Sequence, residues 1–288
     1  MRILASYVLW PALLAAAITA SAIGMTSDHP ILVFNLSYFA LVAVLLFLER
    51  VMPYDGRWLK FDGQLVPDLG HTVLSKTMVQ ILIISLSTIG LAGLIGPSGG
   101  PWWPSHWPMA AQVLIGLVAA EFGFYWAHRL AHEWPVLWRF HAIHHSVRRL
   151  WVVNTGRFHF VDTVVSVTFG LSMALICGAP ETIIVWCAAI TAFVGLLTHC
   201  NVEMRFGILN YIFNTPGLHR WHHSMVPEEG NRNYGENLML FDRLFGTYIN
   251  PDRPPSTEIG IREHMPDRLI GQIAHPFRSG AVTAPAAK

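Results

Sequence analysis

The sequence predicts an all-α, multi-pass integral membrane protein: a bundle of about four membrane-spanning helices with a short helical hairpin. The first observation is compositional, because 53% of the 288 residues are hydrophobic and only 13% are charged, whereas soluble domains are nearer a quarter charged. The second is that long apolar runs follow one another from the N-terminus. The net charge of +1 is not concentrated in any charged run, so nothing favours a nucleic-acid partner.

Four apolar runs meet the length of about 20 residues that a helix needs to cross a hydrocarbon core of roughly 30 Å. They are Ile3–Gly24, Pro30–Leu48, Met78–Ile95 and Met109–Ala127. The first run also resembles a secretory signal peptide, because a basic residue precedes it and small residues end it. It is longer than a usual signal sequence and more runs follow, so we predict an uncleaved first helix.

Two shorter runs, Val164–Ala179 and Ile183–Leu197, are joined by a Gly-Ala-Pro turn. At about 1.5 Å per helical residue, each falls short of a full crossing. We therefore predict either a re-entrant or interfacial hairpin, or a tilted pair that its flanking residues extend.

Basic residues predict the orientation of the bundle. The turns at 25–29 and 96–108 contain no Lys or Arg, whereas the stretches 50–60, 128–159 and 200–288 are rich in them. These stretches fall on one side, which we predict to be the cytoplasm. Arg greatly outnumbers Lys, which favours a GC-rich genome and thus a bacterial inner membrane.

The chain is predicted to form one membrane-embedded domain, 1–288. Transmembrane helices occupy 1–120, a histidine-rich region 121–250 and a tail 251–288, whose last ten residues are predicted to be disordered. The cysteines lack the CxxC-type spacing of a zinc site, and we predict that they are small buried hydrophobic residues. They are Cys177, Cys187 and Cys200.

One short phrase occurs twice in the chain, as HAIHHS at 141–146 and HRWHHS at 219–224. A related phrase, HRLAH, occupies 128–132. Residues three and four apart share one face of a helix, with Cβ atoms about 5–6 Å apart. Each phrase can therefore direct several imidazoles toward one metal ion, or toward two adjacent ions.

Ten of the fifteen histidines lie in such phrases or near them, at one end of the apolar runs. If no metal ion were bound, that many imidazoles next to lipid would be costly to desolvate. Bis-histidine haem favours isolated histidines, and structural zinc uses four ligands, usually with cysteines. The pattern favours a histidine-rich, metal-binding cap on the cytoplasmic side with two metal ions, although imidazole spacing alone does not name the metal.

The sequences that flank these histidine phrases resemble those of a known family. The matching text runs from about Glu121 to Tyr248 and includes the segments "YWAHRLAHEWPVLWRFHAIHHS", "NTGRFH", "LNYIFNTPGLHRWHHS" and "NYGENLMLFDRLFGTY". In this order they resemble the fatty acid hydroxylase/sterol desaturase superfamily of membrane di-iron enzymes. The first 120 residues resemble it only as generic membrane helices.

The resemblance implies a set of iron ligands. Some members of the family have a second histidine after the isolated one, where this chain has Glu203. Either that carboxylate or His159 would complete the set, and we favour His159. The implied ligands are His128, His132, His141, His144, His145, His159, His199, His219, His222 and His223.

The resemblance also implies O₂-dependent oxidation of a lipid, such as a fatty acyl chain or a sterol, at an unactivated C–H bond by two iron ions. Hydroxylation is our first prediction, and desaturation at the same centre is the alternative. The sequence has no flavin or nicotinamide fingerprint, so electrons should come from a separate ferredoxin- or cytochrome-type protein. A membrane metal transporter or metal-binding protein is a third reading, which clustering of the ligands at one face disfavours.

Glu121 lies seven residues before His128, on the same face of the predicted helix. An acidic group in an apolar helix is a functional candidate, and it could accept the N–H of a ligating histidine and so orient its ring. The plainer interpretation pairs Glu121 with Arg129 or Arg157.

Asp242 is a similar candidate for orienting a ligand, and helix capping or a surface pair with Arg243 is its plainer interpretation. Asn154, Arg157 and Asn237 are polar residues close to the histidine phrases. We predict that they hold the histidine-bearing segments together.

Overall fold

The structure is a computed structural model that describes residues 2–88 and 99–278. Within these residues the regular structure is helical, and four helices are long and apolar enough to cross a membrane. They are α1 (Arg2–Met25), α2 (Pro30–Val51), α4 (Met109–Glu133) and α7 (Glu181–His199). The predicted all-α membrane bundle is therefore confirmed.

Two predicted boundaries need correction. The third apolar run belongs to α3 (Leu65–Thr88), which begins well before Met78, and the rest of that run lies outside the described residues. The predicted hairpin consists of α6 (Phe160–Ile176), with 17 residues, and α7, with 19. Polar residues at both ends extend α7 beyond its apolar run, so α7 is long enough to cross whereas α6 is shorter.

Proline marks where several of these helices begin. Pro30 is the first residue of α2, and Pro108 and Pro180 directly precede α4 and α7. A proline there removes no helical hydrogen bond, because the first N–H groups of a helix have no partner within it. Gly178, with φ of 78°, lies in the tight turn between α6 and α7.

The outward face of α2 is apolar and exposed. Ile31, Leu36, Phe39 and Phe47 each leave more than half of their surface uncovered. A water-soluble protein rarely exposes so continuous an apolar surface. This face is therefore the one expected to contact lipid.

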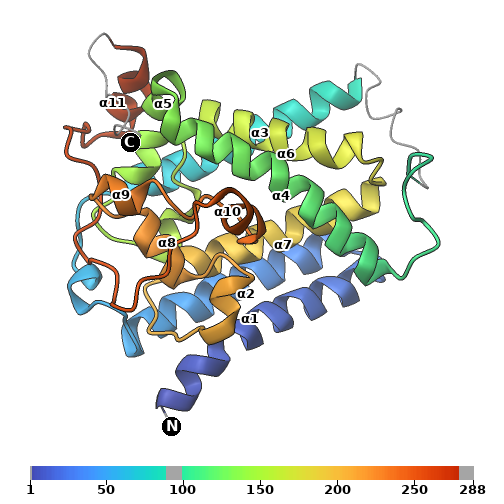
Figure 1. Ribbon diagram of the computed structural model, residues 1–288, viewed down its shortest axis with the longest axis horizontal. Coiled ribbons are helices and arrows are strands. Elements are labelled where there is room, and N and C mark those ends of the chain that lie inside the picture. Colours follow the sequence, from blue (N-terminus) through green and yellow to red (C-terminus); the bar gives the residue numbers. More distant parts are fainter. Residues whose placement is uncertain (1, 89–98, 279–288) are drawn as a thin grey trace.

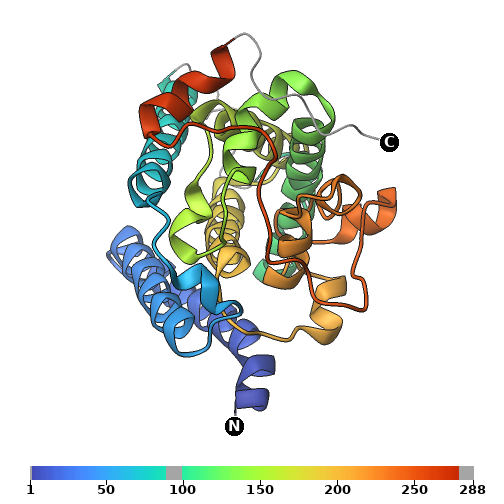
Figure 2. The same cartoon turned by 90° about the vertical axis from the view of Figure 1, so that its left-hand side faces the viewer.

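The long helices lie side by side and the short ones gather at one end (Figure 1). α7 contacts α1, α2 and α4, while α6 lies between α4 and α3. The short helices form what we call the cap, which both views show at the end of the bundle where α1 begins (Figures 1 and 2). The cap comprises α5 (Pro135–His145), α8 (Pro216–His222), α9 (Pro227–Gly230), α10 (Leu240–Phe245) and α11 (Leu269–Ala274).

The cysteines differ in their surroundings. Cys187 and Cys200 are buried, as predicted, whereas Cys177 is exposed at the end of α6. The prediction was wrong for Cys177, which directly follows the last residue of α6 and lies next to the exposed Ile176. The predicted disordered residues at the C-terminus lie outside the described residues.

The α4–α6 contact depends on glycine. A Cβ atom added to Gly123 would lie 2.2 Å from the carbonyl oxygen of Phe169 and 2.8 Å from the Cα of Gly170. Gly123→Ala should push the helices apart and destabilise the protein by about 1–3 kcal/mol, the usual cost of overpacking. The thermal unfolding midpoint of the purified protein in detergent measures this effect.

Gly195→Ala in α7 is the matched control. Its added Cβ would meet only an ordinary contact, 3.5 Å from Thr155, and alanine favours a helix over glycine by about 1 kcal/mol. This variant should unfold at or above the wild-type temperature. Equal unfolding temperatures for the two alanine variants would show that the α4–α6 contact is not tight.

Candidate metal centre

Nine buried histidines form two groups at the cap end of the bundle. Within each group, the nitrogen atoms that could bind a metal lie within 4.8 Å of one another. The five-histidine group consists of His128, His132, His141, His145 and His222. The four-histidine group consists of His144, His199, His219 and His223.

Each HxxHH phrase contributes to both groups. The first and last histidines of a phrase are four residues apart and therefore point the same way from one helical turn. The middle histidine points to the neighbouring group. As a result, His141 and His145 join the five-histidine group with His222, whereas His219 and His223 join the four-histidine group with His144. The two groups are adjacent, since the rings of His145 and His223 are stacked with centroids 4.4 Å apart.

Oxygen acceptors on the outside of the groups set the tautomer of five rings. Each acceptor contacts Nδ1, so this nitrogen carries the proton, and the Nε2 lone pair is left facing the group. Two acceptors are backbone carbonyls, two are asparagine side chains and one is a carboxylate. The Nδ1–oxygen distances are 2.7 Å for His128 to Tyr234, 2.7 Å for His222 to Arg232, 3.0 Å for His132 to Asn231, 3.1 Å for His199 to Asn154 and 2.9 Å for His141 to Asp162.

The inner Nε2 atoms approach one another closely. The distance between Nε2 atoms is 2.9 Å for His199 and His219, and 3.1 Å for His132 and His145. The Nε2 atoms of His128 and His222 are buried and have no hydrogen-bond partner within residues 2–88 and 99–278. Convergent lone pairs in a buried site repel one another unless a cation lies between them, so this donor set fits metal ions.

Burial also keeps the cap histidines in the form that binds metal. Desolvation is the main cause that lowers the pKa of His144, His145, His219, His222 and His223 well below the usual range. These rings are therefore neutral at physiological pH. Neutral imidazole is the ligand form, so metal binding at these positions has no proton to displace.

A small cavity of about 60 Å³ adjoins both histidine groups. Its histidine lining comes from both groups, namely His128, His141, His144, His199 and His219. The rest of the lining includes Phe158 and Ser166, together with the carboxyl-bearing residues Asp162 and Glu236. A substrate group that enters this space lies beside both metal-binding groups at once.

The structure does not bring the predicted tenth ligand, His159, to either group. Its Nδ1 accepts the backbone N–H of Val161 at the start of α6, and its Nε2 lies 3.2 Å from the carbonyl oxygen of Ile273. Both ring nitrogens therefore have structural partners. Glu203 lies at the surface, where it pairs with Arg2 at 2.8 Å.

The structure places both predicted acidic residues close to the site without contact to a histidine. Glu121 and Asp242 are fully buried, and they accept backbone N–H groups of residues 234–237. Burial is the main cause that raises the pKa of Asp242 to about 6. Arg129, which was the alternative partner of Glu121, pairs with Glu133 instead, at 2.8 Å.

The polar residues predicted to join histidine-bearing segments contact these segments. The Asn154 side chain accepts the Nδ1–H of His199 and donates to the carbonyl of Arg149 at 2.8 Å. Asn237 donates to Glu121 in α4 and to Thr191 in α7, at 3.0 and 3.1 Å.

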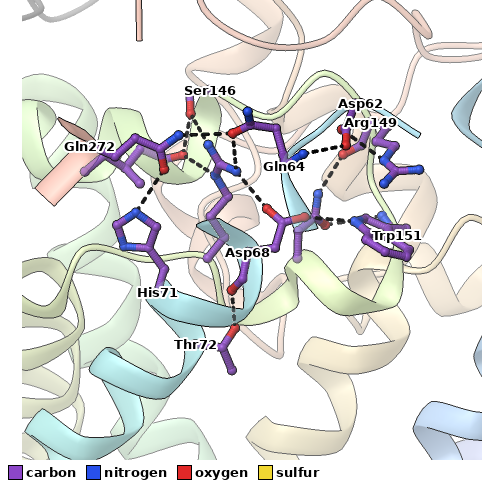
Figure 3. A network of polar contacts seen from close by, with 12 residues as sticks. Asp62, Gln64, Asp68, His71, Thr72, Ser146, Arg149, Trp151 and Gln272 are labelled. Atoms are coloured by element: carbon purple, nitrogen blue, oxygen red, sulfur yellow. Dashed lines mark hydrogen bonds and ion pairs between the residues drawn. The ribbon is translucent and has the colours of Figure 1, made fainter. Parts of the chain in front are cut away.

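Arg157 connects the end of α5 to the start of α3. Its guanidinium donates to the carbonyl of Ile143 at 3.3 Å and forms a buried ion pair with Asp68 at 2.7 Å. Figure 3 shows the surrounding network, in which Gln64 and Gln272 extend the contacts to α11. The C-terminal end of the histidine-bearing helix α5 is thus fixed to the bundle.

Sequence reasoning missed two outer acceptors, Asp162 and Asn231. Asp162 follows the RFHF motif by two residues, and this proximity was the available signal. Asn231 lies in a stretch with several polar residues, where no spacing rule distinguishes it.

The fold and the site define a multi-pass membrane protein with a histidine-rich metal centre, and the comparisons with known proteins place it more narrowly. The chain belongs to the fatty acid hydroxylase family, whose model matches residues 113–247. This family assignment confirms the resemblance seen in the sequence and makes the chain a lipid hydroxylase, an oxidoreductase, rather than a transporter.

Two relatives illustrate the range of the family. The chain is 50% identical to the ornithine lipid hydroxylase OlsE of Rhizobium tropici over 279 residues, which cover 94% of this chain and 84% of the relative. It is 30% identical to the alkylglycerol monooxygenase of Danio rerio over 227 residues, or 76% of this chain and 46% of the relative. No solved structure matches the chain.

Proposed function

We propose that this protein is a di-iron, O₂-dependent hydroxylase of an ornithine lipid or a closely related aminoacyl lipid. The observation that carries the proposal is the 50% identity to an ornithine lipid hydroxylase over nearly the whole chain. The nine buried histidines support it, because their donor set fits two metal ions. Imidazole alone does not select iron, so iron comes from the family and not from the geometry.

The reaction balances when one O₂, two electrons and two protons convert a C–H bond to C–OH and release one water. Two bound iron ions would supply the oxidant that no side chain provides. We propose the nine histidines of the two groups as their ligands. The chain's own task is to hold those rings and to admit one carbon of the lipid.

The oxygen acceptors around the groups would perform the first task. They fix the ring directions before any metal is present, and such outer partners are typically worth 10–100-fold in metal affinity or activity. The small cavity would perform the second task, because its walls admit only a narrow part of the lipid. Burial of the histidines excludes bulk water from the reacting carbon.

We further propose that the cap faces the cytoplasm of a bacterium, where a separate ferredoxin- or cytochrome-type protein supplies electrons. The arginine-rich stretches on the cap side support this orientation. Purified protein should therefore show no turnover with NADPH and O₂ alone. Turnover under those conditions would contradict the need for a separate donor.

The test of function is lipid analysis after expression in a bacterium that makes ornithine lipid and lacks its own hydroxylase. Growth under ¹⁸O₂ should give a new ornithine lipid that carries one labelled oxygen atom, which cells with the empty vector lack. Ornithine lipid that loses two hydrogens without gaining oxygen would indicate desaturation instead. An unchanged ornithine lipid together with labelled oxygen in another lipid would contradict the proposed substrate.

A further inference from the structure

One short segment between α9 and α10 orients most of the five-histidine group. We call residues Asn231–Asn237 the orienting segment. Its side-chain amide at Asn231 and its backbone carbonyls at 232 and 234 accept the Nδ1–H groups of His132, His222 and His128 at 3.0, 2.7 and 2.7 Å. Three of the five rings therefore depend on the position of one stretch of backbone.

Two buried carboxylates hold that backbone in place. Asp242 accepts the N–H groups of residues 234 and 235 at 2.8 and 2.7 Å. Glu121, from the buried face of α4, accepts the next two N–H groups at 2.6 and 3.1 Å. Four consecutive backbone donors are thus bound by two side chains, which explains two buried acidic residues that contact no histidine.

The segment also contains a backbone conformation that fixes its turn. Asn233 has φ of 55°, the left-handed region that asparagine tolerates better than most residues. Its side chain accepts the N–H of Ile249 at 2.9 Å and donates to the carbonyl of the same residue at 3.0 Å. The orienting segment is therefore rigid before any metal binds.

The four-histidine group lacks comparable support. In the part of the chain that the structure describes, only His199 of this group has an outer acceptor, Asn154, at 3.1 Å. The Nδ1 atoms of His144, His219 and His223 are buried and have no hydrogen-bond partner among the described residues. His144 is held instead by stacking on Phe158, with ring centroids 4.0 Å apart.

This difference affects metal binding. A neutral imidazole that binds metal through Nε2 must keep its proton on Nδ1. In the five-histidine group four of these N–H groups have an acceptor, whereas in the four-histidine group three would be buried without one. A buried donor without an acceptor opposes binding, and one outer partner is typically worth 10–100-fold in metal affinity.

We propose that the five-histidine group binds its metal at least about tenfold more tightly than the four-histidine group, and that Glu121 and Asp242 are positioning residues for the tighter site. This inference rests on the proposed two-metal centre. The four-histidine group is then the site that fills last and exchanges first.

The test is equilibrium binding of Co²⁺ to metal-free protein in detergent, with bound metal per chain measured against buffered free Co²⁺. We expect two steps, each of one ion per chain, separated by tenfold or more in free metal. Two ions that bind in a single step would overturn this inference but leave the two-metal centre standing. Failure of the wild-type chain to bind any Co²⁺ would contradict the proposed function as well.

Three variants assign the steps to the groups. Glu121→Gln replaces one acceptor oxygen by a donor. Asn231→Ala removes the side-chain oxygen that accepts the His132 N–H, and Asn231 is only half-buried. Both should weaken the tighter step by about 10–100-fold and leave the weaker step unchanged. Asn154→Ala, the matched control, should weaken only the weaker step.

Asn231→Ala keeps the inference falsifiable even if the deeply buried Glu121→Gln variant fails to fold, and size-exclusion profiles identify folded protein. If Asn231→Ala left the tighter step unchanged, or shifted both steps equally, the orienting role would be refuted. A uniform loss of stability would shift both steps together, so the selective change distinguishes positioning from folding.

Discussion

Replacing His222 by alanine should abolish hydroxylated lipid, and replacing His144 by alanine should do the same. His222 belongs to the five-histidine group and His144 to the four-histidine group. Loss of an outer partner already costs about 10–100-fold in metal affinity or activity, so loss of a ligand should reduce product by more than about 100-fold. Both variants should still insert into the membrane, because the spanning helices are unchanged.

The measurement is the amount of labelled hydroxylated lipid per amount of membrane-inserted protein. His106→Ala is the matched control, because His106 is exposed and lies outside both groups. This variant should retain wild-type activity. Product from either His222→Ala or His144→Ala at more than a tenth of the wild-type level would show that the altered group is not needed for catalysis.

Replacing Arg157 by glutamine should destabilise the protein by about 3–5 kcal/mol, the usual effect of removing one partner of a buried ion pair. The Arg157 and Asp68 side chains are 2% and 1% exposed. The change leaves a buried carboxylate without its cation. It also removes the donors to the Ser146 hydroxyl and to the Ile143 carbonyl at the end of α5.

Arg57→Gln makes the same substitution in an exposed ion pair. Arg57 is 67% exposed and pairs with Asp55 at 2.8 Å, and water screens such an exposed pair, so it contributes little to stability. Thermal unfolding in detergent should therefore show a large decrease in midpoint for Arg157→Gln and little change for Arg57→Gln. Similar midpoints for the two variants would mean that the network in Figure 3 does not stabilise the cap.

The sequence predicted the helical bundle and the histidines because both depend on local patterns. Apolar runs long enough to cross a bilayer identified α1, α2 and α4. Helical spacing identified histidines that share a face, and nine of the ten predicted ligands lie in the two groups. The apolar run alone left two alternatives open for α7, and the structure agrees with extension by flanking residues, because the helix continues through polar end residues that the run does not include.

The division of the histidines between groups was not predictable from spacing. Spacing places His141, His144 and His145 on one turn, but only packing against α8 separates the middle ring from the other two. His159 was favoured over Glu203 to complete the ligand set that the resemblance implies, and nothing local indicated that a backbone N–H and a distant carbonyl would satisfy its two nitrogens. The outer acceptors Asn231 and Asp162 also depend on contacts between segments far apart in the sequence.

The most direct test of the metal centre is the metal content of protein purified without oxygen, compared among wild type, His222→Ala and His144→Ala. The wild-type chain should contain two iron ions, and each variant should lose iron. Wild-type protein that contains no iron, or variants that keep the full wild-type content, would contradict a two-iron centre held by these histidines.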